Sequence, residues 1–112
     1  MKLITAIVRA DKADDVARDL INAGARGVTV TEVLGFGQQH GHVPGAVNAE
    51  RGVILLPKLR LDVVVRDQEA TAVADAIAKS AWTGAIGDGK IWVCPVEHAL
   101  RVRTGERDDD AI

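Results

Sequence analysis

The alternation of apolar and polar residues in the first half of the chain predicts a strand, a helix and a second strand. Residues 2–9 and 28–36 are strand-like, because they are rich in Ile, Leu, Val and Thr or alternate apolar with polar positions. Between them, apolar residues recur at helical spacing, with Asp11 and Asp14 suited to the helix N-terminus and Gly24 to its end.

The second half of the chain repeats this order. Residues 55–65 place Leu and Val opposite charged residues and predict a third strand. Asp67 is expected to cap a second helix, whose apolar stripe runs to about Ala81. A glycine-rich turn follows, and the pattern then predicts short strands over residues 91–96 and 100–103.

Residues 37–53 join the two halves and show neither a helical nor a strand period. They contain several glycines and a proline, so we interpret them as a long loop. Loops of this length inside compact domains are usually binding or regulatory elements.

The order of elements predicts a ferredoxin-like α+β fold, a double βαβ sandwich in a single domain over residues 1–112. Two helices then cover one face of the sheet and leave the other bare. A domain of this size buries only about two-thirds of its unfolded surface, so we expect copies of the same chain to cover the bare face in a closed ring.

Charge and composition exclude several classes of function. The chain has 14 Lys and Arg against 16 Asp and Glu, and aromatic residues make up 3% of it, which argues against nucleic-acid binding. A single cysteine forms no intramolecular disulfide and fits a reducing compartment. We find neither a signal peptide nor an apolar run that could enter a membrane, so we expect a cytoplasmic protein.

The glycine-rich turn before the 91–96 strand contains the spacing G-x-x-x-x-G-K, which is similar to a phosphate-binding P-loop. Ile91 stands where a P-loop has Ser or Thr, and a strand follows instead of a helix, so a true P-loop is not supported. Backbone N–H groups and Lys90 are nevertheless suited to phosphate. The alternative interpretation is a solvated turn.

Arg101 and Arg103 lie two residues apart, which in a strand places both on one face about 6.6 Å apart. Two guanidinium groups at that spacing are suited to neighbouring phosphates. The alternative is that they only make an exposed strand soluble. With Lys90 they form a set of three cations in an otherwise acidic chain.

Other reactive side chains give weaker signals. His40 and His42 could bind a metal with His98 or Cys94, but they lack orienting partners in the sequence. Cys94 is expected to be a small buried residue, because it lies in an apolar strand. The only serine, Ser80, falls in a predicted helix with no histidine near it, so a hydrolase triad has no support.

With these segments in place, the chain resembles the P-II signal-transduction proteins over its whole length. The strongest match is the run T-x-x-x-G-D-G-K-I-W-V that starts at Thr83 and ends at Val93. Shorter matches occur over residues 29–33, 35–37, 56–58 and 101–106.

The resemblance implies a sensor rather than an enzyme. It implies a homotrimer that binds ATP or ADP competitively in clefts between subunits and reads 2-oxoglutarate through Mg²⁺-ATP. It also implies three named loops: a T-loop over about 37–55, a B-loop over 82–90 and a C-terminal loop over 101–112. The T-loop would contact a target protein of nitrogen or carbon metabolism, whether an enzyme, a transporter or a regulator, and the sequence does not identify that target.

The resemblance also assigns roles to individual residues. Those that would surround the nucleotide are Thr29, Gly35, Phe36, Gly37, Gln38, Asp62, Ile86, Gly87, Asp88, Gly89, Lys90, Arg101 and Arg103. Those that would bind 2-oxoglutarate are Arg9, Gln39, Gly41 and Lys58. Gln39 would also coordinate the Mg²⁺ of ATP.

The departures from the family concentrate in the T-loop. The family motif Y-R-G-A-E-Y is replaced by A-V-N-A-E-R. Arg51 therefore stands in place of the tyrosine that is modified in the family, and Val47 stands in place of the arginine with which many relatives plug an ammonium channel. At two positions where the family commonly has cations that help to hold phosphate, this chain has Gln38 and His40. We therefore expect a preference for ADP or AMP, weak or absent 2-oxoglutarate binding, and a target other than an ammonium channel.

Two alternatives remain open from the sequence. A small phosphoryl-transfer enzyme of the same fold would need metal carboxylates, for which Asp62 and Asp88 are the candidates. A trimer for metal tolerance or protein interaction, independent of nucleotide, would depend on His40 and His42.

Overall fold

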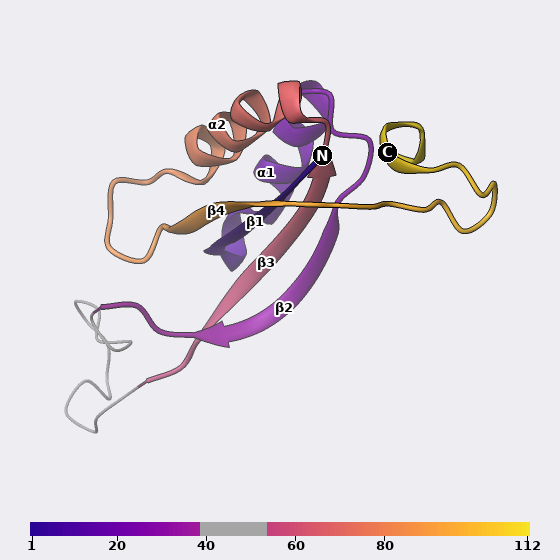
Figure 1. Cartoon of the computed structure of the whole chain (residues 1–112). Coiled ribbons are helices and arrows are strands. Elements are labelled where there is room, and N and C mark those ends of the chain that lie inside the picture. Colours follow the sequence, from indigo (N-terminus) through magenta and orange to yellow (C-terminus); the bar gives the residue numbers. More distant parts are fainter. Residues whose placement is uncertain (39–53) are drawn as a thin grey trace.

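The chain folds into one four-stranded sheet with two helices on one side (Figure 1). We describe it from a computed structural model that covers residues 1–38 and 54–112. All neighbouring strands are antiparallel, and the sheet order is β2-β3-β1-β4. The strands are β1 (Lys2–Arg9), β2 (Thr29–Gly35), β3 (Leu56–Val65) and β4 (Gly89–Pro95). This is the ferredoxin-like α+β arrangement that the sequence predicts.

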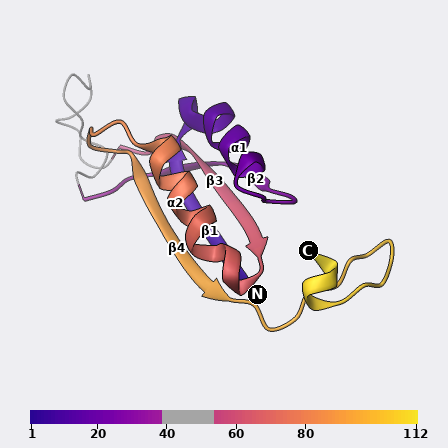
Figure 2. The same ribbon diagram turned by 90° about the horizontal axis from the view of Figure 1, so that it is seen from above.

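The two helices lie next to each other above the sheet, as Figure 2 shows. They are α1 (Ala13–Asn22) and α2 (Ala70–Ala81). Short 3₁₀ turns precede them at Ala10–Lys12 and Asp67–Glu69, and a third occurs at Asp108–Ala111. Among the described residues, no helix is both long and apolar enough to cross a membrane.

Aliphatic side chains between the helices and the sheet form the core. Alternate residues of β1 and β3 face the helices, because side chains in a strand point to opposite faces in turn. Residues four apart on each helix meet them. The core side chains are at most 4% exposed and comprise Ile4, Ala6, Val8, Val16, Leu20, Leu61, Val63, Val65, Val73, Ile77 and Ala81.

Neither helix covers the other face of the sheet, as predicted. Thr5 of β1 lies in register with Asp62 on β3 and with Trp92 on β4, so these side chains share that face. Trp92 is 39% exposed and Val64 is 37% exposed. Cys94 is also exposed, and the expectation that it is buried is therefore wrong, because it lies on the face away from the helices.

The predicted strand over residues 100–103 is wrong. Only Leu100 forms a bridge, and its partner is Arg107. The chain turns back between them: the Gly105 N–H donates to the Arg101 carbonyl at 2.9 Å, and Gly105 has φ of +74°. Glycine adopts this left-handed conformation without a steric penalty, so the chain reverses instead of continuing as a strand. Arg101 and Arg103 are therefore not alternate residues of one strand face.

The predicted role of Asp67 as a helix cap is also wrong. Its carboxylate accepts a hydrogen bond from the amino group of Met1 at 2.7 Å. Glu69 instead accepts a hydrogen bond from the backbone N–H of Arg66 at 3.3 Å, at the start of the 3₁₀ turn that leads into α2. The sequence pattern could not show this, because Met1 and Asp67 meet only in the folded chain.

Candidate functional site

Asp88 organises the B-loop between α2 and β4. Its Oδ2 accepts the backbone N–H groups of Thr83 at 2.8 Å and Gly84 at 2.9 Å, and its Oδ1 accepts the Thr83 hydroxyl. The Thr83 hydroxyl hydrogen bond, with the backbone bonds and Arg9, holds the pKa of the Asp88 carboxyl well below its usual range. The loop is therefore closed around a charged carboxylate.

Two cations from the sheet fasten this loop. Arg9 and Lys58 lie directly opposite each other in β1 and β3. The Arg9 Nε donates to Asp88 Oδ1 at 2.9 Å and its Nη2 to the Ile86 carbonyl, while Lys58 Nζ donates to the Gly87 carbonyl at 2.8 Å. Burial, followed by the neighbouring Arg9 charge, lowers the pKa of Lys58.

Three glycines give the B-loop its shape. Gly84 has φ of +84°, Gly87 has φ of +98° and Gly89 has φ of +113°, conformations that other residues rarely adopt. A Cβ at Gly89 would lie 1.7 Å from the carbonyl oxygen of Ile7 in β1. No side chain fits there, so the backbone conformation at the start of β4 requires glycine.

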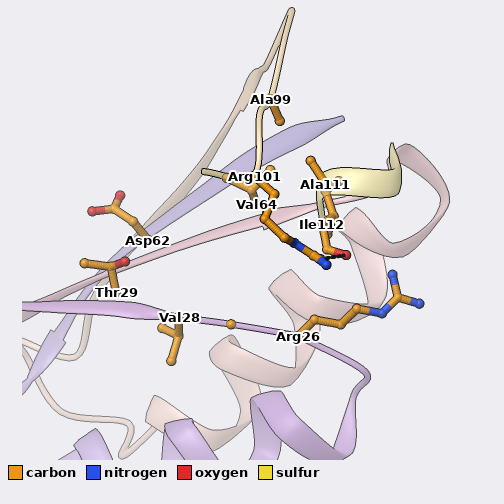
Figure 3. Close-up of a pocket in the computed structure, with 10 residues that line it drawn as sticks. Arg26, Val28, Thr29, Asp62, Val64, Ala99, Arg101, Ala111 and Ile112 are labelled. Carbon is orange, nitrogen blue, oxygen red and sulfur yellow. Dashed lines mark hydrogen bonds between the residues drawn. The ribbon is translucent and has the colours of Figure 1, made fainter. Parts of the chain in front are cut away.

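A pocket of about 490 Å³ lies elsewhere on the sheet, against the last loop of the chain (Figure 3). Thr29 from β2 and Asp62 and Val64 from β3 contribute to its lining, together with Arg101 from the turn. The Arg101 side chain points toward Ile112 and donates to its main-chain oxygen from Nη2 at 3.2 Å.

Asp62 is a charged acceptor in this pocket. Its Oδ2 accepts the Arg60 Nε at 2.9 Å, and its Oδ1 accepts the Thr5 hydroxyl at 2.8 Å. The hydrogen bond from Arg60 is the main cause that lowers the pKa of Asp62. Thr29 lies in register with Asp62 on the neighbouring strand, so both present polar atoms at the same end of β2 and β3.

The B-loop and the C-terminal loop, which lines part of the pocket, lie at opposite ends of β4 (Figure 1). Lys90 is the second residue of β4, whereas Arg101 and Arg103 follow its other end. A strand of this length spans about 20 Å. The three cations that the sequence singles out are therefore not brought together within one chain.

The predicted nucleotide residues divide in the same way. At the B-loop end lie Gly35, Phe36, Gly37, Gln38, Ile86, Gly87, Asp88, Gly89 and Lys90. At the pocket end lie Thr29, Asp62, Arg101 and, in the adjoining turn, Arg103. Gln39, His40, Gly41, His42, Val47 and Arg51 lie outside the described residues.

Val64, Glu106 and Ile112 also shape these two regions, although the sequence did not predict a role for them. Val64 lines the pocket, and period-two alternation with Asp62 is the signal that could have identified it. Glu106 and Ile112 contact Arg101, and no local pattern predicts these contacts, because they depend on the turn. In the described part of the chain, no group of three or more His, Cys, Asp and Glu residues could hold a metal ion.

Comparisons with known proteins match the whole chain. A family model described as nitrogen regulatory protein P-II matches residues 1–106. The chain is 46% identical to nitrogen regulatory protein GlnK of Escherichia coli strain K12 over 112 residues, which is all of both proteins. It is 48% identical to nitrogen regulatory protein P-II of Pasteurella multocida and 49% identical to that of Haemophilus influenzae, again over the full length of each.

Proposed function

Since the chain belongs to the family of nitrogen regulatory proteins P-II, we propose that it acts by binding an adenine nucleotide between subunits of a homotrimer. Its relatives are named as regulatory proteins, so it is a signalling regulator of nitrogen metabolism and not an enzyme. The exposed, unpaired Cys94 supports a reducing compartment, and we place the protein in the cytoplasm.

The observation that carries the proposal is the separation of two half-sites along β4. Gly87, Gly89 and Lys90 form a turn suited to phosphate at one end. Thr29, Asp62 and Arg101 line a pocket at the other. In a closed ring of identical subunits, the B-loop of one subunit meets the pocket of the next, and each interface completes one site.

The bare face of the sheet supports assembly. Trp92 and Val64 leave apolar surface in water in a single chain, and burying such surface stabilises by about 25 cal/mol per Å². Self-association covers this face without an additional protein.

The charges of the half-sites favour an adenine nucleotide. Lys90, Arg101 and Arg103 supply cations for a di- or triphosphate. An ionised Asp62 only accepts hydrogen bonds, so it suits the amino group of adenine and repels the carbonyl oxygen that guanine has at the same position.

Effector binding follows from the contacts of Lys58 and the changes in the T-loop. Lys58 donates one of its three N–H groups to the Gly87 carbonyl, so a 2-oxoglutarate carboxylate would have to share Lys58 with the B-loop. Gln38 stands where relatives have a cation, and Gln39, the residue that would coordinate the Mg²⁺ of ATP, lies outside the described residues. We therefore propose ADP or AMP as the preferred ligand, weak or absent binding of 2-oxoglutarate, and a target protein other than an ammonium channel, reached through the T-loop.

The phosphoryl-transfer alternative is not supported. Asp88 and Asp62 lie at different ends of the sheet, and each already accepts several hydrogen bonds within the chain. The names of the relatives describe regulators. The metal-tolerance alternative depends on His40 and His42, which lie outside the described residues.

Calorimetric titration of ADP tests the site. Lys90→Ala and Arg101→Ala are each expected to weaken ADP binding about tenfold or more, because a hydrogen bond to a charged group contributes roughly 1.5–3 kcal/mol. Arg18→Ala is the matched control, because Arg18 is an exposed cation on α1 that pairs with Asp15. Unchanged ADP affinity in both site variants would show that this is not the nucleotide site.

A mixing experiment tests whether the site lies between subunits. Lys90→Ala and Arg101→Ala chains are unfolded together and refolded as mixed assemblies. Some interfaces then combine an intact B-loop with an intact pocket, so part of the tight ADP binding returns. If binding does not return although the mixed assemblies form, both half-sites belong to the same subunit.

A further inference from the structure

Arg101 is already engaged by acceptors of its own chain. Its Nη1 donates to Glu106 Oε1 at 3.2 Å, and its Nη2 donates to the main-chain oxygen of Ile112 at 3.2 Å. The backbones of the first pair are also joined, because the Arg101 N–H donates to the Glu106 carbonyl at 2.9 Å. The guanidinium therefore has one side-chain carboxylate oxygen and one main-chain oxygen on two of its nitrogens.

The segment that supplies these acceptors is fastened beside the pocket. Leu100 and Arg107 form a bridge, and the Asp108 N–H donates to the Ala99 carbonyl at 2.9 Å. Arg66, which precedes the 3₁₀ turn at Asp67–Glu69, donates from its Nη2 to the Asp109 carbonyl at 3.3 Å. Ala111 and Ile112 line the pocket itself. The contact between Arg101 and Glu106 is thus held by the fold of the last loop.

We propose that Glu106 is a specificity-determining residue, which occupies the place of a ligand phosphate on Arg101 and has to be displaced before a nucleotide binds. The inference rests on the proposed nucleotide site. A guanidinium binds pairs of oxygen atoms in a planar fork, and Glu106 and Ile112 already supply two oxygens here. A ligand without charge cannot compete with the carboxylate, whereas a phosphate group can.

Glu106 thereby favours charged ligands over neutral ones. A diphosphate displaces the Glu106 carboxylate oxygen from Arg101 and places its own, more highly charged oxygens there, so Arg101 keeps an ionic contact. Adenosine regains nothing and binds without Arg101. The side chains of Arg101 and Glu106 are 40% and 43% exposed, so solvent weakens their attraction. Exposed ion pairs of this kind correspond to about a two- to fivefold change in affinity.

The test is calorimetric titration of the full chain with ADP and with adenosine. Glu106→Gln keeps the shape of the side chain and removes its charge, and it is expected to bind ADP about two- to fivefold more tightly than the native chain. Its affinity for adenosine is expected to be unchanged. Asp110→Asn is the matched control, because it changes the net charge equally in the same loop at a residue whose recorded contact is a backbone hydrogen bond to Arg107.

A double variant separates the contact from a general charge effect. In the Arg101→Ala background, Glu106→Gln is expected to leave ADP affinity unchanged, because the guanidinium that Glu106 otherwise occupies is absent. Glu106→Ala serves as a second variant, and tryptophan emission checks that each variant folds.

Three results would overturn the inference. If the native chain binds ADP and neither Glu106 variant binds it more tightly, the proposed nucleotide site stands and the role of Glu106 fails. An equal gain in Asp110→Asn would also reject that role, because the effect would then be net charge. If no chain binds ADP, the native one included, both the nucleotide site and the role of Glu106 fail.

Discussion

Replacing Gly89 by Ala is expected to destabilise the protein strongly, because the added methyl group overlaps the backbone of β1. The ideal Cβ position lies 1.7 Å from the carbonyl oxygen and 2.8 Å from the carbonyl carbon of Ile7. Both are backbone atoms in a strand between two neighbours, so no rotamer change relieves the overlap. The start of β4 has to move away from β1.

Two contributions set the expected loss of unfolding free energy in Gly89→Ala. A left-handed conformation costs an alanine about 1–2 kcal/mol relative to glycine, and Gly89 has φ of +113°. Forcing the backbone apart to admit an extra carbon costs typically about 1–3 kcal/mol. The sum, about 2–5 kcal/mol, is a large part of the roughly 5–15 kcal/mol that stabilises a domain.

Chemical denaturation with two glycine controls separates these contributions. Gly105 has φ of +74° and no atom within 4 Å of an added Cβ, so Gly105→Ala measures the conformational cost alone. Gly27 has open space and no left-handed φ, so Gly27→Ala is expected to change stability by less than about 1 kcal/mol. All chains are compared at one subunit concentration, because assembly raises the midpoint of unfolding.

The expected order of stability is Gly27→Ala, then Gly105→Ala, then Gly89→Ala. A Gly89→Ala chain as stable as Gly105→Ala would show that the close approach to Ile7 is not what requires glycine there. A Gly89→Ala chain as stable as Gly27→Ala would reject the conformational argument as well.

Three further predictions concern the core, the B-loop and the bare face. Ile77→Ala removes a fully buried side chain and is expected to cost about 2–5 kcal/mol in urea denaturation, whereas Ile21→Ala, at a side chain 71% exposed, should change stability by less than about 0.5 kcal/mol; equal effects would contradict the assignment of the core. The folded pKa of Asp88 lies below its unfolded value of about 3.9, so its ionised form stabilises the fold above about pH 4 and that contribution is lost as the pH falls further. Melting temperatures of the native chain and Asp88→Asn should therefore converge in acid, and a difference that grows on acidification would be inconsistent with this sign. If the proposed assembly forms through the bare face, Trp92→Glu places a charge there and is expected to shift the light-scattering mass toward the monomer, while Ile21→Glu on α1 is not. An unchanged mass for Trp92→Glu would contradict assembly through this face.

The sequence predicts the elements whose patterns are local. A run rich in Ile, Leu, Val and Thr identifies β1, and alternating apolar residues identify β3. The apolar stripe of Val73, Ile77 and Ala81 identifies α2, because a helix face repeats within a few residues. The glycine-rich turn is also identified in place, since Gly87 and Gly89 have left-handed backbones.

Contacts between distant residues could not be predicted in this way. The Leu-Arg-Val-Arg run alternates like a strand, but the pairing of Leu100 with Arg107 makes it one side of a turn. Asp67 has the chemistry of a helix cap, but in the folded chain its carboxylate accepts a hydrogen bond from the amino group of Met1. The role of Arg101 and Arg103 in nucleotide binding stays a prediction, because within one chain Arg101 contacts Glu106 and Ile112 of its own loop and lies far from Lys90.

The pairing of Gly35 with Leu56 at the end of the β2–β3 hairpin has an evolutionary consequence. Once a stem holds the two ends of a connection at strand spacing, doubling the length of the connection costs only about 0.6 kcal/mol in closure entropy. Insertions and deletions between these two residues can therefore accumulate in a lineage of such proteins with little loss of stability, while the hairpin folds as before.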